Sequence, residues 1–336
     1  MKYTAPHSFY WRRSSSSQCT AEVESTLDTS ESWEHNDRPF SLTSYGESVQ
    51  CRQRIPTMPD TRSLLQNHYH DASRLDARIQ LHARYSTNPQ DFHSWVFAHL
   101  HMPPTCQVLE VGCGSGQLWL VNRHRLPTGW DVTLSDLSAG MLATAHYQLS
   151  PYGHAFRFVV HEAQTLPFAA HSFNAIIANH MLYHVPNRPA AYAEFCRVLK
   201  PGGRLYAATI SRDNMRELDA LVARVHPLHA PGSTVAHPMN DRRQRTGFNL
   251  EHGATELSQW FASVTLDRYA DALVVPETEP LVMYVRSTGR LTEDELTRFQ
   301  DYVQDLIARH GPIRISKDVG MFEASQPRTR SPGAMR

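Results

Sequence analysis

A strand, a glycine-rich turn and the start of a helix follow one another in Val108-Leu109-Glu110-Val111-Gly112-Cys113-Gly114-Ser115-Gly116-Gln117-Leu118-Trp119. The stretch opens with an apolar run that is typical of a strand buried on both faces. Glycines then alternate at positions 112, 114 and 116, and an apolar pattern that fits a helix resumes at Leu118. Because glycine has no Cβ atom, it permits both the turn and the close approach of a ligand to the backbone. The pattern therefore predicts a ligand site where the strand meets the N-terminus of the helix.

The spacing of these glycines distinguishes two types of cofactor. A dinucleotide fingerprint, Gly-x-Gly-x-x-Gly, would require glycine at position 117 or 119, where this chain has Gln117 and Trp119. An acidic residue, Glu110, instead stands two positions before the first glycine. A carboxylate at that position suits a ligand with an ammonium group better than a ligand with a pyrophosphate. The alternative is an ordinary strand-to-helix turn, which rarely needs three glycines in five residues.

Length and composition indicate a globular chain. Its 336 residues can form one large domain with extensions or two small domains. A hydrophobic content of 41% and a charged content of 20% are typical of a soluble globular protein. The 33 basic and 33 acidic residues give a formal net charge of +0, which disfavours nucleic acid as a partner. No apolar run approaches the roughly 20 residues that span a bilayer.

The cysteines and the N-terminus bear on the cellular setting. Five cysteines without paired short spacing disfavour a disulfide framework and a zinc site, so we expect no metal. The N-terminus lacks the apolar core of a secretory signal. Its basic, serine-rich start faintly resembles a mitochondrial transit peptide, but six acidic residues between Glu22 and Asp37 weaken that interpretation. We therefore expect a reduced, cytoplasmic setting.

The sequence predicts a domain with an extension at each end. Residues 1–60 are polar and are predicted to be disordered, either as a dispensable tail or as a regulatory or targeting segment. Residues 61–325 are predicted to form the domain, with its core at 104–212, and residues 326–336 a loose tail. Helices are expected to precede the first strand, and Tyr85 between them is expected either to reach a bound cofactor or simply to pack.

Strands and helices alternate after the glycine turn, which implies a parallel sheet covered by helices on both faces. The further strands are expected at residues 130–136, 156–160, 172–179, 204–210, 264–269 and 313–324. Asp136 ends the second strand, where a carboxylate can hold a ribose diol by paired hydrogen bonds. Capping of the next helix is the alternative role for Asp136. Met141 on that helix is placed to pack against an adenine face.

The order of the motifs carries a family resemblance. Glu162-Ala163 and Leu166-Pro167-Phe168 follow the third strand, and Lys200-Pro201-Gly202-Gly203 precedes the fifth. With the glycine turn and Asp136, this order resembles the class I (Rossmann-like) S-adenosylmethionine-dependent methyltransferases of the ubiquinone and small-metabolite type. The resemblance covers about residues 104–212.

This resemblance implies an α/β fold with a seven-stranded, mostly parallel sheet, an antiparallel last strand and helices on both faces. It also implies S-adenosyl-L-methionine as the cofactor. Two positions depart from the family pattern, because Glu162 replaces the usual Asp and Asn174 replaces the usual acid. The predicted cofactor-binding residues are Tyr85, Glu110, Gly112, Cys113, Gly114, Gly116, Asp136, Leu137, Met141, Glu162, Ala163 and Asn179.

Two histidines after the fourth strand are the predicted catalytic residues. Methyl transfer from a sulfonium depends mainly on alignment and on exclusion of water, and a general base is needed only if the acceptor must lose a proton. His180 and His184 are four positions apart and would share one face of a helical turn. The alternative is that these histidines pack or hydrogen-bond beside the cofactor.

The acceptor is predicted to be a small molecule that is methylated on oxygen or carbon. Enzymes that methylate nucleobase amines commonly have Asn/Asp-Pro-Pro-Tyr/Phe after the fourth strand, where this chain has Asn179-His180-Met181-Leu182. The alternatives are an RNA or protein methyltransferase, and a methyltransferase-like protein that binds a ligand or acts as a cyclase without methyl transfer. We expect a monomer or a homodimer.

Overall fold

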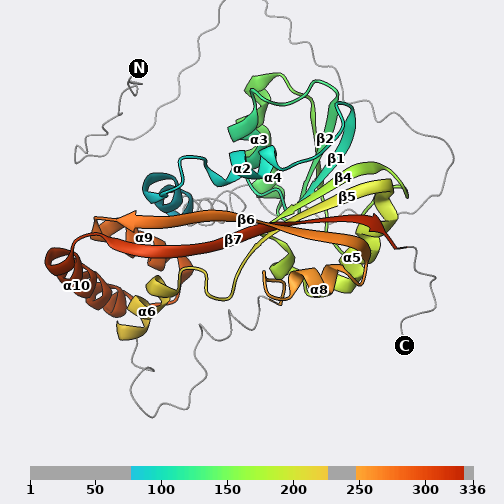
Figure 1. Cartoon of the computed structure of the whole chain (residues 1–336). Helices are drawn as coiled ribbons and strands as arrows, with labels where there is room; N and C mark the ends of the chain where they lie inside the picture. The colour runs from blue at the N-terminus through green and yellow to red at the C-terminus, as the bar shows by residue number, and fades with distance from the viewer. Residues whose placement is uncertain (1–76, 226–246, 329–336) are drawn as a thin grey trace, which may run out of the picture. The chain divides into compact units, whose positions relative to one another are not determined.

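The computed structural model describes residues 77–225 and 247–328 (Figure 1). All of these residues belong to one compact unit. The predicted disordered extension, residues 1–60, therefore lies outside the described residues, and so do the last eight residues of the predicted tail.

The described residues form one seven-stranded sheet with the order β3-β2-β1-β4-β5-β7-β6. Its strands are β1 (Cys106–Val111), β2 (Trp130–Asp136), β3 (Phe156–Val160), β4 (Phe173–Asn179), β5 (Leu199–Ile210), β6 (Phe261–Val275) and β7 (Ile313–Pro327). Strands β1 to β5 are parallel, and β7 pairs antiparallel with both β5 and β6. The strand order reverses between β1 and β4, which creates a topological switch point at their carboxyl ends. The predicted fold class is confirmed.

Helices cover both faces of the sheet. They are residues 77–85, α2 (Phe92–Ala98), α3 (Gln117–Asn122), α4 (Ala139–Leu149), α5 (Arg188–Val198), α6 (Arg216–Val225), α8 (Gly253–Leu257), α9 (Thr278–Thr288) and α10 (Glu293–His310). Thr292 and Glu295 form a capping box at the start of α10. No helix within the described ranges is long and apolar enough to cross a bilayer.

Alternate residues of the central strands face two different cores, as expected for strands buried on both faces. Leu109, Ile176 and Leu205 pack with α5 and α8, and their neighbours Val108, Ile177 and Tyr206 pack with α2, α3 and α4. The prediction of a helix after every strand is wrong at β3. Residues 161–172 form turns and loops between β3 and β4, and Pro167 lies within them.

A third core lies around the outer halves of β6 and β7. These strands have 15 residues each, longer than the predicted strands at 264–269 and 313–324, and β7 extends two residues into the predicted tail. Helices α6, α9 and α10 and the helix at 77–85 pack there and form what we call the helical lobe (Figure 1). Ile210, the last residue of β5, is paired with Val319 of β7, so residues 313–318 extend past the carboxyl end of β5. The helical lobe therefore lies beyond the edge of the sheet where ligands bind in open α/β folds.

Candidate functional site

The three glycines of the turn between β1 and α3 all have left-handed backbone angles. Their φ values are 70° at Gly112, 55° at Gly114 and 78° at Gly116. A Cβ atom on Gly112 would lie only 2.7 Å from Cβ of Met181, whereas a Cβ atom on Gly114 would meet nothing within 4 Å. Glycine is therefore required at 112 by both sterics and conformation, and the backbone at 114 is open to an approaching group.

Asp136 joins this turn to the start of α4. Its Oδ2 accepts a hydrogen bond from the Gly114 amide at 2.9 Å, and its Oδ1 accepts one from the Ser138 amide at 2.8 Å. Ser138 is itself the N-cap of α4 and accepts from the Met141 amide. The alternative role of Asp136 as the helix cap is therefore filled by Ser138. Each carboxylate oxygen has a further lone pair that can accept from a ribose hydroxyl.

Glu110 is buried beneath the turn, where only 3% of its surface is exposed. It accepts hydrogen bonds from Nε1 of Trp119 at 2.5 Å and from Nδ2 of Asn179 at 3.5 Å. Burial raises the pKa of this carboxyl to about 8, against the hydrogen bonds that oppose the rise. Oδ1 of Asn179 is buried and has no hydrogen-bond partner within the described part of the chain. An ammonium group placed here would donate to this oxygen and stabilise ionised Glu110.

The loop after β3 carries the predicted adenine contacts, and α5 holds it in place. Arg197 donates to the carbonyl oxygens of Phe168 at 2.6 Å and Leu166 at 2.8 Å, and Glu194 accepts from the Leu166 amide at 2.8 Å. On this loop Ala163 is buried and Glu162 is exposed, where it accepts from the Gln164 side chain. Glu194 and Arg197 were not predicted from the sequence, although their spacing of three on a helix places them on one face.

The remaining predicted cofactor residues fall into two groups. Cys113 is buried within the turn, Met141 is half-buried in the first turn of α4, and Leu137 is 72% exposed beside Asp136. These three side chains lie next to the residues described above. Tyr85, by contrast, is buried in the core of the helical lobe, with residues of α6, α9 and α10. Packing, the alternative role of Tyr85, is what the structure shows.

The two candidate catalytic histidines are not on one face of a helix, and that expectation is wrong. His180 has a left-handed φ of 52°, and a short 3-10 helix, η2 (Leu182–His184), follows it. His180 is therefore not in a helical conformation, and the pair is not spaced along one helical turn. The His180 ring packs 4.9 Å from the ring of Phe92, whereas His184 is exposed and its ring lies 4.5 Å from that of Tyr183.

His180 instead belongs to a group that we call the histidine cluster, which is His82, His93 and His180. Burial is the main reason that the pKa of His180 falls to about 3, and the nearby His93, His82 and Lys317 contribute to the same fall. Burial also lowers the pKa values of His82 and His93 to about 4. All three rings are therefore neutral at pH 7. Sequence analysis missed His82, His93 and Lys317, because they come from segments far apart in the chain.

A buried ion pair stands beside the histidine cluster. Asp271 of β6 is fully buried and accepts from Nζ of Lys317 on β7. The same carboxylate accepts from Oγ of Ser86 at 2.7 Å and from the amides of Thr87 and Asn88 at 3.0 and 3.1 Å. Asp271 thus fastens the segment before α2 to the antiparallel pair of strands β6 and β7. Within the described ranges, no group of three or more His, Cys, Asp or Glu side chains is placed to hold a metal.

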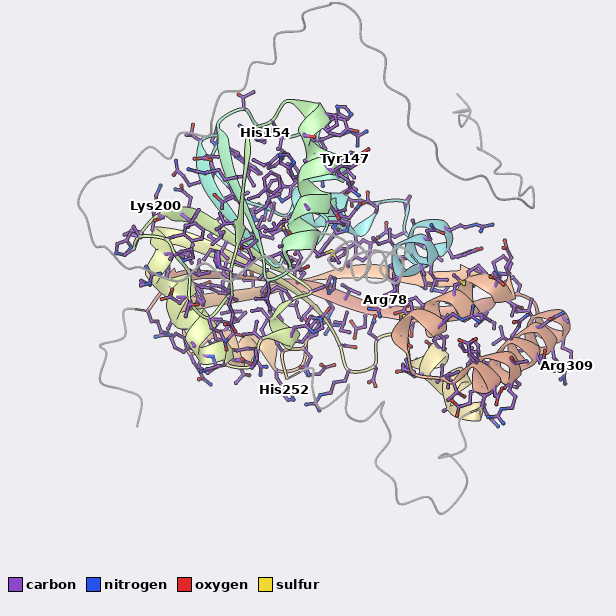
Figure 2. The ribbon with its side chains drawn as sticks, turned by 180° about the vertical axis from the view of Figure 1, so that it is seen from behind. Arg78, Tyr147, His154, Lys200, His252 and Arg309 are labelled. Atoms are coloured by element: carbon purple, nitrogen blue, oxygen red, sulfur yellow. The ribbon has the colours of Figure 1, made fainter. Side chains whose placement is uncertain are left out.

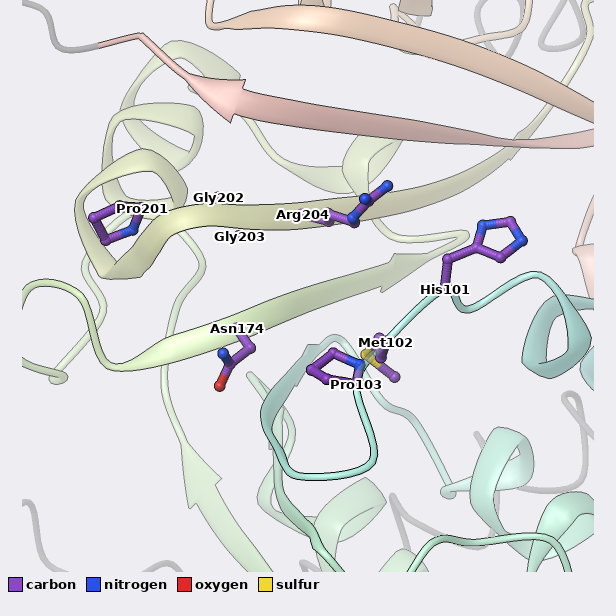
Figure 3. A pocket seen from close by; sticks show the side chains of 8 residues that line it. All are labelled: His101, Met102, Pro103, Asn174, Pro201, Gly202, Gly203 and Arg204. Carbon is purple, nitrogen blue, oxygen red and sulfur yellow. The ribbon is translucent and has the colours of Figure 1, made fainter.

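A separate hollow of about 120 Å³ lies between the segment before β1 and the first halves of β4 and β5 (Figure 3). Its lining includes Asn174 and Arg204, whereas β4 and β5 end at Asn179 and Ile210. The hollow is therefore at the edge of the sheet opposite the glycine turn. Asn174, which replaces the usual acid, has a structural role there, because its Oδ1 accepts from the Gln107 amide and from Lys200. Figure 2 shows Lys200 and Arg309 far apart, the latter at the end of α10 in the helical lobe.

Comparison with known proteins shows what the region around the glycine turn is similar to. Residues 109–207 match the family model described as a methyltransferase domain. A demethylmenaquinone methyltransferase of Symbiobacterium thermophilum is 30% identical over 125 residues, which are 37% of this chain and 50% of that protein. The O-methyltransferase rstn1 of Aspergillus nomiae is 28% identical over 149 residues, 43% of this chain and 64% of that protein. The chain thus spans between half and two thirds of the length of these two relatives.

The YcgJ protein from Bacillus subtilis aligns with 70% of this chain and 98% of its own chain, with a TM-score of 0.48 and 17% identity.

Proposed function

Because residues 109–207 match a methyltransferase domain, we propose that this chain transfers a methyl group from S-adenosylmethionine to oxygen or carbon of a small organic acceptor. The observation that carries the proposal is the left-handed glycine turn at the switch point of the sheet, joined to Asp136 by the Gly114 amide. A turn of this kind exposes backbone and presents a carboxylate at the same place, as a ligand with a ribose and an ammonium group requires.

The residues present fit the cofactor at each of its ends. Glu110 and the unpartnered Oδ1 of Asn179 would hold the ammonium group. Asp136 would accept from the ribose hydroxyls, for which each of its oxygens keeps a lone pair. The adenine would lie between Met141 of α4 and the loop with Glu162 and Ala163. These contacts follow consecutive strands along the carboxyl edge.

When bound, the cofactor supplies a methyl group on a positively charged sulfur, which is already a good leaving group. The chain then has to align the acceptor and exclude water, and good alignment lowers such a barrier by roughly 7–11 kcal/mol. For an acceptor that must lose a proton, His180 is in its neutral form at pH 7 and can accept a hydrogen bond from it. The exposed His184 is the candidate that exchanges a proton with solvent.

Calorimetric titration of the full chain with S-adenosylmethionine, S-adenosylhomocysteine and NADH tests the cofactor. We expect micromolar binding of the two sulfur compounds and none of NADH. Absence of binding by both sulfur compounds, or binding of NADH in their place, would contradict the proposal.

Asp136→Ala tests the ribose contact. We expect S-adenosylhomocysteine to bind about 10- to 100-fold more weakly, because a hydrogen bond to a charged group contributes about 1.5–3 kcal/mol. Asp131→Ala on the same strand is the matched control, since Asp131 forms only an exposed ion pair with Arg157. Equal affinities of the two variants, both with unchanged melting temperature, would remove Asp136 from the site.

A further inference from the structure

The two outer strands of the sheet, β3 and β6, differ in how their free edges are protected. The segment before α2 covers the edge of β6. Ser86 forms a bridge with Leu273, and the Thr87 amide donates to the Ala272 carbonyl at 2.8 Å. Because these backbone groups of β6 already have partners, this part of the edge is closed to pairing with another strand.

The edge of β3 has no such cover in the part of the chain that the structure describes. There β3 pairs with β2, and no other segment bridges its outer side. Its sequence, Phe-Arg-Phe-Val-Val, contains no proline, glycine or lysine, and its register along β2 is continuous from Phe156 to Val160. Natural edge strands are commonly protected by lysine, proline or a bulge. A regular, mainly apolar edge strand is therefore suited to a further strand.

The backbone of β3 shows which of its groups face outward. The His161 amide donates to the Asp136 carbonyl at 3.2 Å, so the odd-numbered residues of this segment turn their backbone groups toward β2. Phe156, Phe158 and Val160 therefore turn their N–H and C=O groups outward. The side chains of these three residues share one face of the strand. Phe156 and Phe158 pack there against the core that includes α3 and α4, and Val160 is 52% exposed.

A second copy of β3 fits this edge when it runs antiparallel, with a two-fold axis at Phe158. In that register Phe158 faces Phe158 of the second copy, and Phe156 faces Val160. Each of these facing pairs can exchange two hydrogen bonds between the outward backbone groups. Their side chains form aromatic and β-branched pairs, which stabilise antiparallel strands. A shift of two residues would leave outward groups unpaired, so one register satisfies all of them.

The charges on β3 are compatible with a second copy. In the same register Arg157 faces Val159 of the second copy, so no like charges stand directly opposite each other. The two Arg157 side chains become diagonal neighbours, but each is already paired with Asp131 of its own chain. The formal net charge of the whole chain is +0, so two copies do not repel each other at pH 7. A strongly acidic or basic partner would meet no unpaired opposite charge on β3.

Exposed tyrosines beside β3 extend the surface that a second copy would contact. α4 packs against β2 and β3, and its Tyr147 is 80% exposed. Tyr152 ends the short helix η1 (Ser150–Tyr152) just before β3 and is also exposed. Figure 2 shows Tyr147 at the end of the molecule away from Arg309 of the helical lobe. A two-fold axis through the joined sheet would place both copies of α4 on one face, and tyrosine is enriched in protein interfaces.

We propose that the chain forms a homodimer in which the two β3 strands pair antiparallel about Phe158, so that the two seven-stranded sheets continue as one. The dimer does not depend on the proposed function, because the residues that form it are described without reference to a cofactor or an acceptor.

Sedimentation equilibrium of the full chain tests the association. We expect a mass of twice 38.2 kDa at micromolar concentration. Val160→Lys places a lysine opposite Phe156 at both ends of the strand pair and is expected to weaken dimerisation at least tenfold. Val274→Lys is the matched control, because Val274 is an exposed valine of β6, the other outer strand. It should leave the mass unchanged, and thermal melting shows whether both variants are folded.

Amide hydrogen exchange of the unsubstituted chain tests the register without relying on a variant. The amides of Phe156, Phe158 and Val160 should become protected as the protein concentration rises. Those of Arg157 and Val159 should be protected at every concentration, because they face β2. A monomer at every concentration, or a dimer that Val160→Lys does not weaken, would overturn the inference. Protection of the outward amides without a change in mass would also overturn it, since another part of the same chain would then cover β3.

Discussion

The glycine turn and the histidine cluster occupy the same edge of the sheet, but the chain assembles them differently. At the glycine turn, Glu110, Asp136 and Asn179 stand at or near the ends of adjacent strands, and their contacts are made among β1, β2 and β4. The histidine cluster draws one residue each from the helix at 77–85, from α2 and from the end of β4. Its neighbour Asp271 binds Ser86 across 185 positions of sequence.

The glycine turn is therefore set by local sequence, whereas the histidine cluster is set by tertiary contacts. The geometry of the glycine turn depends on φ angles that the residues themselves favour. The geometry of the histidine cluster depends on the antiparallel pair β6 and β7 and on the ion pair between these strands. The two regions should therefore respond differently to substitution, and the predictions below test that expectation.

The largest effect is expected for Asp271→Ala. This substitution leaves Lys317 buried without a partner and removes the anchor of residues 86–88, and breaking a buried pair typically costs about 3–5 kcal/mol. We expect the free energy of unfolding to fall by that amount, with faster hydrogen exchange in the helix at 77–85. Asp318→Ala removes an exposed pair with Arg268 and should cost at most about 1 kcal/mol. Equal losses in the two variants, measured by denaturant unfolding, would show that Asp271 does not hold the segment.

A smaller effect on stability is expected for Gly112→Ala. The new Cβ atom would meet Met181 at 2.7 Å on a backbone with φ of 70°, and a strained residue of this kind costs about 1–3 kcal/mol. Gly153→Ala is a matched control, because Gly153 also has φ of 70° but nothing within 4 Å of the new atom. We expect only Gly112→Ala to lose S-adenosylhomocysteine binding in a calorimetric titration. Retained binding in Gly112→Ala would contradict the close packing of the turn.

The most gradual effect is expected from pH, because one linked proton changes stability by at most about 1.4 kcal/mol per pH unit. Glu110 has a pKa of about 8 when folded, above its ordinary 4.5, so the folded state keeps a proton that the unfolded state has lost. Its contribution should therefore decrease as the pH rises from about 5 to 8. The histidine cluster has pKa values of about 3 to 4, below the ordinary 6.5, so only the unfolded state gains these protons. Its contribution should decrease as the pH falls below about 6.5.

Two sets of variants test separately the loss of stability at higher pH and the loss at lower pH. Glu110→Gln should flatten the loss of stability between pH 5 and 8, and replacement of all three cluster histidines by glutamine should flatten the loss below pH 6.5. Denaturant unfolding at a series of pH values measures both. An unchanged profile in either set would show that the corresponding group titrates alike in the folded and unfolded states.

The sheet and the glycine turn could be predicted from the sequence because their signals are local. Alternating and apolar runs located the strands, and glycine spacing located the turn. The separation of His180 from His184 could not be predicted, because it depends on a left-handed residue with no glycine to mark it. The full length of β6 and the helix α9 were not predicted. Both are stabilised by packing in the helical lobe, and such tertiary packing leaves no signal in the local sequence pattern. The partners of the histidine cluster were missed for the same reason.

The position of β7 at the end of the described chain has a consequence for folding during synthesis. Among the strands that the structure describes, β6 pairs with β7 alone, and β7 also covers the edge of β5. During synthesis, the strands at the middle of the sheet are made first, whereas β6 must await the last part of the described chain. Until residues 313–327 emerge, β5 and β6 each present unpaired backbone groups, which is the kind of exposed edge that promotes aggregation. A nascent chain that stops before Ile313 would therefore depend on a chaperone or be removed by proteolysis.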